Sequence, residues 1–180
     1  MKQSTFDSSN FDEIKQLFTK TFSDSEGQDE GLVIGNLSYD LMTTTKDSDF
    51  HGFVAINDDR KIIGSVFFTR ISFNKSDINA FILSPMAIQT NSQGNGIGQK
   101  LINFGLHILK ENKVELIFTY GDPNFYSKVG FHQISEKLVK APFKLSFPEG
   151  WLCQSISSDK IKPINGKSSC VKALNKADLW

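Results

Sequence analysis

Apolar residues recur at helical spacing in two stretches near the start of the chain. The first stretch follows Ser8 and Ser9, which can cap a helix, and its apolar positions are Phe11, Ile14, Leu17, Phe18 and Phe22. The second predicts a helix from Val33, Leu37 and Leu41 at four-residue steps, although Gly31 and Gly35 weaken the prediction for its first half. The polar residues 23–30 between them predict an acidic loop.

The pattern then changes to short apolar runs. Residues 52–56 and 62–68 flank the polar residues 57–61, which predicts a β-hairpin. An apolar strand over 81–88 leads into a polar turn and then into a helix whose apolar face comprises Ile97, Leu101, Ile102, Gly105, Ile108 and Leu109. Strand pairs followed by strand–helix–strand predict an α/β or α+β domain with a mixed sheet.

The remainder of the chain gives shorter and weaker signals. Residues 114–118 predict a buried strand, and Asp122 followed by Pro123 is a typical helix start, with Gly130 ending that segment. Further candidate strands are 131–139, 151–156 and 170–174, and the polar residues 157–169 predict a surface loop.

Length and charge narrow the class of protein. The 180 residues predict one domain over 1–180 with a sizeable core, to which 16 phenylalanines contribute. Basic and acidic residues balance at 20 each, so no net field draws the chain to nucleic acid or to a membrane. Cys153 and Cys170 have no metal-type spacing, and no signal peptide or spanning apolar run is visible. We therefore expect a cytoplasmic protein without a metal.

The turn after the 81–88 strand carries the most informative chemistry. Gly94, Gly96 and Gly98 alternate at the start of a helix, where N–H groups lack helical partners and suit a phosphate. The P-loop pattern fails here, because Lys100 is followed by leucine. A Rossmann fingerprint fits poorly, since the third glycine comes one place early, although Asp122 resembles its acidic ribose partner. A plain glycine-rich turn without a ligand is the remaining alternative.

Two segments together resemble a known family. Residues 93–98 match the Q/R-x-x-G-x-G/A signature of the GNAT superfamily of acyl-CoA-dependent N-acetyltransferases, and residues 125–131 resemble its F-Y-x-K-x-G-F segment. The resemblance is strong over 50–131, and 121–126 look like a bacterial subgroup with a G-[DH]-P-x-[YF]-Y segment. It implies a mixed, mostly antiparallel sheet that splays at the cofactor site and is flanked by helices. Residues 132–180 would then form acceptor-side strands and loops.

The resemblance also implies roles for individual residues. Acetyl-CoA would be the co-substrate, and Tyr126 would protonate the departing thiolate, which is feasible because a phenol has a pKa of about 10 and a thiol of about 8.5. Many members carry an asparagine where this chain has Thr119, which weakens one expected cofactor contact, and Asn124 is not its equivalent. The residues expected to bind the cofactor are Met86, Ala87, Ile88, Gln93, Gly94, Asn95, Gly96, Ile97, Gly98, Gln99 and Asn124.

The acceptor is less defined by the sequence. The resemblance implies a primary amine on a small molecule or peptide, and a homodimer is common for the family. No general base is identified, because Glu26, Asp29 and Glu30 in the predicted acidic loop are typical of a solvated face and the three histidines are scattered. Two alternatives stay open: a non-catalytic acyl-CoA-binding or regulatory module on the same fold, and a Rossmann-type protein that binds NAD.

Overall fold

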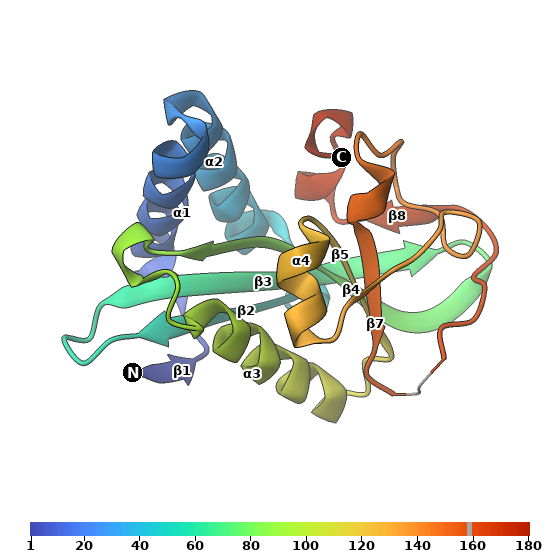
Figure 1. Ribbon diagram of the computed structural model, residues 1–180, viewed down its shortest axis with the longest axis horizontal. Coiled ribbons are helices and arrows are strands. Elements are labelled where there is room, and N and C mark those ends of the chain that lie inside the picture. Colours follow the sequence, from blue (N-terminus) through green and yellow to red (C-terminus); the bar gives the residue numbers. More distant parts are fainter. Residues whose placement is uncertain (158–159) are drawn as a thin grey trace. The chain divides into compact units, whose positions relative to one another are not determined.

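The computed structural model describes residues 1–157 and 160–180, and its contacts divide the chain into two compact units. The first unit comprises Met1–Phe68 and Pro85–Gly105, and the second comprises Thr69–Ser84 and Leu106–Trp180. Three elements contribute to both units: the strands β3 (Ile62–Phe73) and β4 (Ser76–Ile88) and the helix α3 (Ile97–Glu111) (Figure 1).

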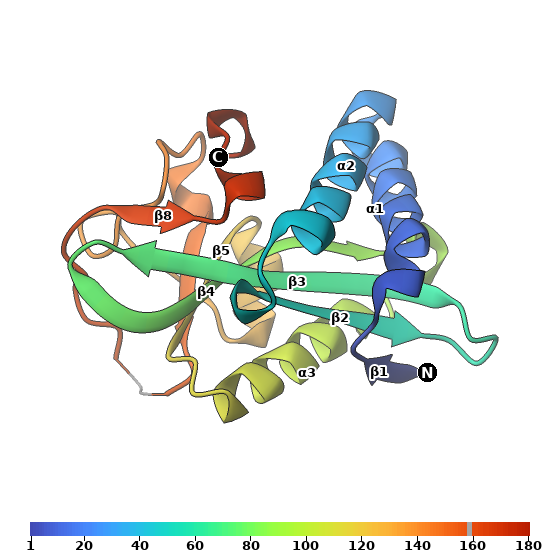
Figure 2. The same ribbon diagram turned by 180° about the vertical axis from the view of Figure 1, so that it is seen from behind.

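In the first unit, β1 (Lys2–Ser4) and β2 (Phe50–Ile56) form an antiparallel pair, and β2 is followed along the sheet by β3. The predicted hairpin is therefore confirmed. The helices α1 (Phe11–Glu26) and α2 (Gln28–Thr44) pack side by side (Figure 2). Glycine is required at their contact, because a Cβ atom at Gly31 would lie 1.9 Å from Ser23 Oγ and one at Gly35 would lie 1.9 Å from Thr19 Oγ1.

The predicted acidic loop over 23–30 is wrong. Gly27 alone separates α1 from α2, and its φ of 101° lies in a region that side chains rarely adopt. Asp29 and Glu30 occupy the first turn of α2, where their charges complement the helix dipole. The predicted serine cap is also wrong, since Asp7 accepts a hydrogen bond from Ser9 N–H and caps a 3-10 turn that precedes α1.

The second unit is built around β5 (Leu116–Tyr120). It pairs in parallel with β4 and antiparallel with β7 (Trp151–Ser155), which in turn pairs with β6 (His132–Gln133). The strand β8 (Ser168–Cys170) pairs antiparallel with β3, and α4 (Pro123–Tyr126) follows β5. The Trp151 ring is fully buried and stacks on Phe118 at a centroid distance of 5.2 Å.

Strand ends differ from the predictions in several places. β5 begins two residues later than the predicted 114–118, and β4 begins at Ser76 rather than at 81. Only His132–Gln133 of the predicted strand over 131–139 is a strand, and β8 ends where the strand over 170–174 was predicted to begin. Residues 158–159 of the predicted surface loop lie outside the described residues. The predicted fold class, a mixed and mostly antiparallel sheet flanked by helices, is confirmed.

Short 3-10 segments connect these elements: η1 (Ser8–Asn10), η2 (Asp47–Asp49), η3 (Thr90–Ser92), η4 (Ser127–Val129), η5 (Pro148–Gly150), η6 (Lys172–Leu174) and η7 (Ala177–Leu179). In the described part of the chain, no helix combines the length and the apolar character that a membrane span requires. The single domain over 1–180 stays a prediction.

Candidate active site

The glycine turn of the first unit lies between η3 and α3. Gly94 and Gly96 have φ values of 77° and 71°, so the turn uses backbone angles that favour glycine at both positions. A Cβ atom at Gly94 would meet nothing within 4 Å, and one at Gly96 would approach only Gln99 Oε1, at 4.0 Å. The space above both glycines is therefore open.

Two side chains brace this turn. Gln93 Nε2 donates a hydrogen bond to Ile88 O at 2.9 Å, and Asn95 Nδ2 donates to Gln93 O at 3.2 Å. Lys100 N–H donates to Gly96 O at 3.1 Å at the start of α3. The N–H groups of residues 97–99 precede that first helical bond and point along the positive end of the helix dipole. This geometry can bind an anion such as a pyrophosphate.

The strand that leads into the turn ends at Met86, Ala87 and Ile88, of which Met86 is half-buried and the other two are buried. The described pairs between β4 and β5 run from Ala80↔Leu116 to Leu83↔Thr119, whereas β4 continues to Ile88. The parallel ladder thus ends at Leu83↔Thr119, one residue before β5 itself ends at Tyr120, and splaying of the sheet stays a prediction.

Tyr126 lies in the second unit, on α4. Asp122 caps this helix by accepting from Asn124 N–H at 2.9 Å, and Pro123 occupies its first position, as predicted. The Tyr126 ring packs edge-on against Phe125 and Phe131, with centroid distances of 5.1 and 5.7 Å. It also lies against Gly121, where a Cβ atom would come within 2.7 Å of Tyr126 Cε2. The ring is therefore held from three sides.

Thr119 holds the hydroxyl end of Tyr126. The Thr119 side chain is fully buried, hydrogen bonds to the Tyr126 hydroxyl, and donates its own proton to Leu83 O at 3.0 Å. Burial raises the pKa of Tyr126 above its ordinary value of 10.0, the Thr119 hydrogen bond lowers it, and the charge of Asp122 raises it. The Tyr126 phenol is consequently neutral at physiological pH. This contact of Thr119 was not predicted from the sequence.

Asn124 is exposed, and its side chain is used locally. Its Nδ2 group donates to Asp122 Oδ1 at 3.1 Å, the same oxygen that accepts from Asn124 N–H. This arrangement stabilises the start of α4. A role of Asn124 in cofactor binding stays a prediction.

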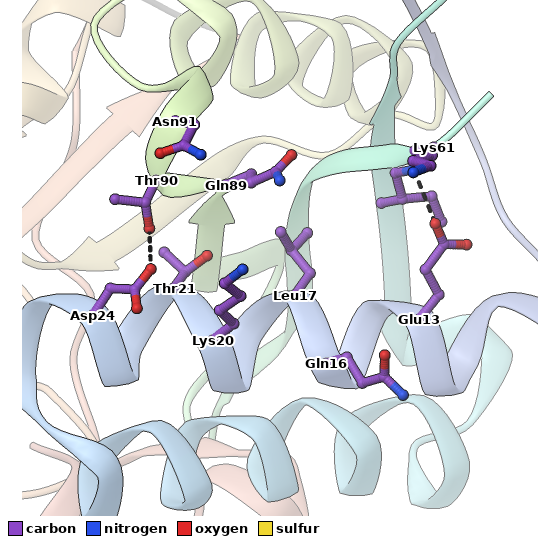
Figure 3. Close-up of a pocket in the computed structure, with 11 residues that line it drawn as sticks. Glu13, Gln16, Leu17, Lys20, Thr21, Asp24, Lys61, Gln89, Thr90 and Asn91 are labelled. Atoms are coloured by element: carbon purple, nitrogen blue, oxygen red, sulfur yellow. Dashed lines mark hydrogen bonds between the residues drawn. The ribbon is translucent and has the colours of Figure 1, made fainter. Parts of the chain in front are cut away.

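A groove in the first unit borders the segment that enters the glycine turn (Figure 3). It has a volume of about 280 Å³ and carries two carboxylates and two ammonium groups. Both carboxylates are engaged, because Asp24 Oδ2 accepts from Thr90 Oγ1 at 2.6 Å and Glu13 Oε1 accepts from Ile62 N–H at 3.0 Å. The former bond ties α1 to η3. The groove is lined by Glu13, Gln16, Leu17, Lys20, Thr21, Asp24, Lys61, Ile62, Gln89, Thr90 and Asn91.

The other reactive side chains form no catalytic arrangement in the described residues. Burial raises the pKa of the Cys153 thiol far above its usual value and that of Cys170 to about 11, so neither is a thiolate nucleophile near neutral pH. His107 is exposed and lies 3.5 Å from Glu111 Oε1 one helical turn away. Among the described residues, no group of three or more histidine, cysteine, aspartate or glutamate side chains could hold a metal ion.

Comparison with known proteins identifies relatives. Residues 48–133 match the family model described as an acetyltransferase (GNAT) domain. The chain is 32% identical over 118 residues to the uncharacterized N-acetyltransferase YhbS of Escherichia coli K12, which covers 66% of this chain and 65% of the relative. A second relative, the uncharacterized N-acetyltransferase YjhQ of the same strain, is 30% identical over 106 residues, or 54% of this chain and 57% of the relative. The matched part thus spans slightly less than two thirds of the YhbS chain.

Solved structures share the fold. The crystal structure of the Escherichia coli GNAT family protein YhbS in complex with CoA has a TM-score of 0.80 and 21% identity, covering 97% of this chain and 92% of that one. A Brucella melitensis GNAT family acetyltransferase in complex with acetyl-CoA has a TM-score of 0.68 and 21% identity, covering 96% and 97%. These likenesses extend over nearly the whole chain.

Proposed function

We propose that this chain, which is similar to the GNAT acetyltransferase domain over residues 48–133, transfers an acetyl group from acetyl-CoA to a primary amine by direct attack on the thioester. The observation that carries the proposal is the open glycine turn at the start of α3. Its positive φ angles and the unfilled space above Gly94 and Gly96 suit a phosphate group held by main-chain N–H donors. The CoA and acetyl-CoA complexes of structural neighbours agree with this donor.

The proposed binding residues divide into two groups. The turn from Gln93 to Gln99 would hold the pyrophosphate, with Gln93 and Asn95 bracing the loop through their side chains. The end of β4, at Met86, Ala87 and Ile88, would supply a main-chain N–H to the thioester oxygen as it gains negative charge. Acetyl-CoA supplies the activated acyl group in this scheme.

Tyr126 would give its hydroxyl proton to the sulfur as the carbon–sulfur bond breaks. The attacking amine loses one proton and the departing thiolate gains one, so the transfer is balanced once Tyr126 is reprotonated from solvent. Burial keeps the phenol neutral, which is the state that a proton donor needs. Hydrogen bonding of the same hydroxyl to Thr119 keeps the donor in a fixed place.

The remaining parts of the proposal concern partners and location. We expect an amine on a small molecule or peptide as acceptor, no nucleic acid or membrane partner, and a cytoplasmic location. A homodimer remains an expectation from the family. Of these parts, only the acceptor amine takes part in the chemistry at Tyr126.

Calorimetric titration of the purified chain with acetyl-CoA and, separately, with NAD tests the donor. Acetyl-CoA should bind in the micromolar range that CoA-dependent enzymes use, about −8 kcal/mol, and NAD should not. Release of the CoA thiol in the presence of amines then tests transfer. Absence of acetyl-CoA binding, or a preference for NAD, would refute the proposal, and tight binding without thiol release from a broad set of amines would favour a non-catalytic module.

A further inference from the structure

A second cavity, wholly within the second unit, lies where β5 passes into α4. Its volume is about 300 Å³, at the lower end of the range for small-molecule sites. Residues from the end of β5 and from the segment before β7 form its wall: Tyr120, Gly121, Asp122, Pro123, Phe147, Glu149 and Gly150. We call it the β5–α4 pocket.

Hydrogen bonds fix the two sides of the β5–α4 pocket against each other. Phe147 N–H donates to the Tyr120 hydroxyl oxygen at 2.7 Å, and Gly121 N–H donates to Gly150 O at 3.0 Å. The Tyr120 ring in turn stacks on Trp180, with a centroid distance of 6.3 Å and nearly parallel planes. The pocket is therefore formed before any ligand arrives, which lowers the entropic cost of binding.

The lining has a defined chemical character. The Tyr120 ring, Pro123 and Phe147 offer apolar surface, and Phe147 leaves 66% of its surface exposed, which is unusual for a phenylalanine. The charged lining residues are Asp122 and Glu149, both negative. Neither carboxylate forms a salt bridge within the described residues. Asp122 Oδ1 already accepts two hydrogen bonds from Asn124, but neither carboxylate has a cationic partner in the described part of the chain. An aromatic surface beside carboxylates without a cationic partner attracts a cation that carries an apolar group.

The β5–α4 pocket and the ring of Tyr126, the proposed proton donor, share one neighbour, Gly121, although Tyr126 itself does not line the pocket. Gly121 lines the pocket and also lies against the Tyr126 ring, where its missing side chain leaves room for Cε2. Tyr120 and Gly121 come directly after Thr119, which binds the Tyr126 hydroxyl. One short stretch of main chain therefore joins the pocket to the acid.

We infer that the β5–α4 pocket binds the acceptor, and that the acceptor is a small cationic amine bearing an aromatic or branched aliphatic group. This inference rests on the proposed function, which requires an amine near Tyr126. Asp122 and Glu149 attract the ammonium group, and Phe147 packs on the apolar part of the molecule. A polyamine is a poorer ligand, because its additional charges would have to lose water against an apolar wall.

The test measures binding of 2-phenylethylamine to the full chain, without acetyl-CoA, by NMR titration. Glu149→Gln should weaken binding about twofold to fivefold, the range of an exposed ion pair. Phe147→Ala should weaken it about fivefold through loss of the aromatic contact. Glu136→Gln, which removes an exposed carboxylate of the same unit outside the pocket, should leave binding unchanged. 1,4-Diaminobutane should bind more weakly than 2-phenylethylamine.

Unchanged binding in both pocket variants, tighter binding of 1,4-diaminobutane, or no binding of 2-phenylethylamine to the wild-type chain would overturn the inference. Thiol-release assays separate this result from the fate of the proposed function. Turnover of amines with the same kcat/KM in wild type and both pocket variants would refute the pocket and leave the transferase. Binding that depends on Glu149 and Phe147, without any turnover, would support the pocket and refute the transferase.

Discussion

Replacing Thr119 with valine is the sharpest test of how Tyr126 is held. Valine keeps the branched shape of threonine and replaces only the hydroxyl with a methyl group. In the folded chain that hydroxyl serves two partners, the Tyr126 hydroxyl and the main-chain carbonyl of Leu83. Thr119→Val therefore separates the hydrogen bonds from the packing at a position with no exposed surface.

Two opposing terms set the expected loss of stability. Leaving buried polar groups without this partner costs about 1–3 kcal/mol, and the added methyl group returns roughly 0.8 kcal/mol. We therefore expect a destabilisation of about 0.2–2.2 kcal/mol. Because the Thr119 hydrogen bond lowers the pKa of Tyr126, its removal should raise that pKa further. Part of the general-acid contribution, typically 10²- to 10⁴-fold, should be lost from kcat with little change in KM for acetyl-CoA.

NMR of the chain labelled at tyrosine Cζ reads the contact directly. Tyr126→Phe assigns the signal among the three tyrosines, and Thr119→Val should shift the Tyr126 signal at neutral pH and move its titration to higher pH. Thr119→Ser is the matched control, since it keeps the hydroxyl and should preserve both the signal and most of kcat. A Tyr126 signal and a kcat equal to wild type in Thr119→Val would show that this reasoning is wrong.

Other predictions follow from the same geometry. Tyr126→Phe should lower the rate of thiol release at least 100-fold while acetyl-CoA affinity stays nearly constant, as a roughly 10²-fold acid contribution requires. Gly96→Asp should abolish measurable acetyl-CoA binding in calorimetry, whereas Gly96→Ala should chiefly cost about 1–2 kcal/mol of stability in denaturant titration because of its φ of 71°. Burial raises the folded-state pKa of Tyr126, so the stability that the neutral phenol contributes is complete below about pH 10 and is lost as pH rises through the folded pKa. The free energy of unfolding should therefore fall less between pH 8 and pH 11 in Tyr126→Phe than in the wild type. Alkylation at pH 8 should modify Cys170, with its pKa of about 11, slowly, and Cys153 only after unfolding.

Periodic apolar spacing predicted the elements that bury one face. The helix from Phe11, the hairpin and the helix after the glycine turn were all predicted, because each has enough apolar positions to define its period. Val33 was one of the three apolar positions from which its helix was predicted, yet it is 48% exposed, while Ile34 is buried. The glycines of α2 concealed the buried face, since Gly31 and Gly35 lie at the contact with α1 and carry no apolar side chain that would mark it.

Local polarity was a poor guide where a helix end is exposed. Residues 23–30 read as a loop because charged side chains and a glycine dominate them, yet α1 continues to Glu26 and α2 starts at Gln28. A helix end needs few apolar residues, since its last turn is solvated and its charges interact with the dipole. The short strands near the C-terminus failed for a related reason: β6 and β8 span two and three residues, too few to show an alternation.

The sequence predicted the glycine turn of the candidate site better than the surroundings of Tyr126. The glycine turn is local, so the six residues 93–98 are enough to determine its geometry. The φ values of 77° and 71° at Gly94 and Gly96 agree with the unusual backbone angles that the glycine spacing indicated. The hydrogen-bond partner of Tyr126, Thr119, depends instead on where the pairing between β4 and β5 ends. Leu83↔Thr119 is the last described pair between β4 and β5, and the Leu83 carbonyl accepts from the Thr119 hydroxyl there. The family that the chain resembles often has asparagine at this place, and a threonine that also binds the Tyr126 hydroxyl could be identified only once the register of the two strands was known.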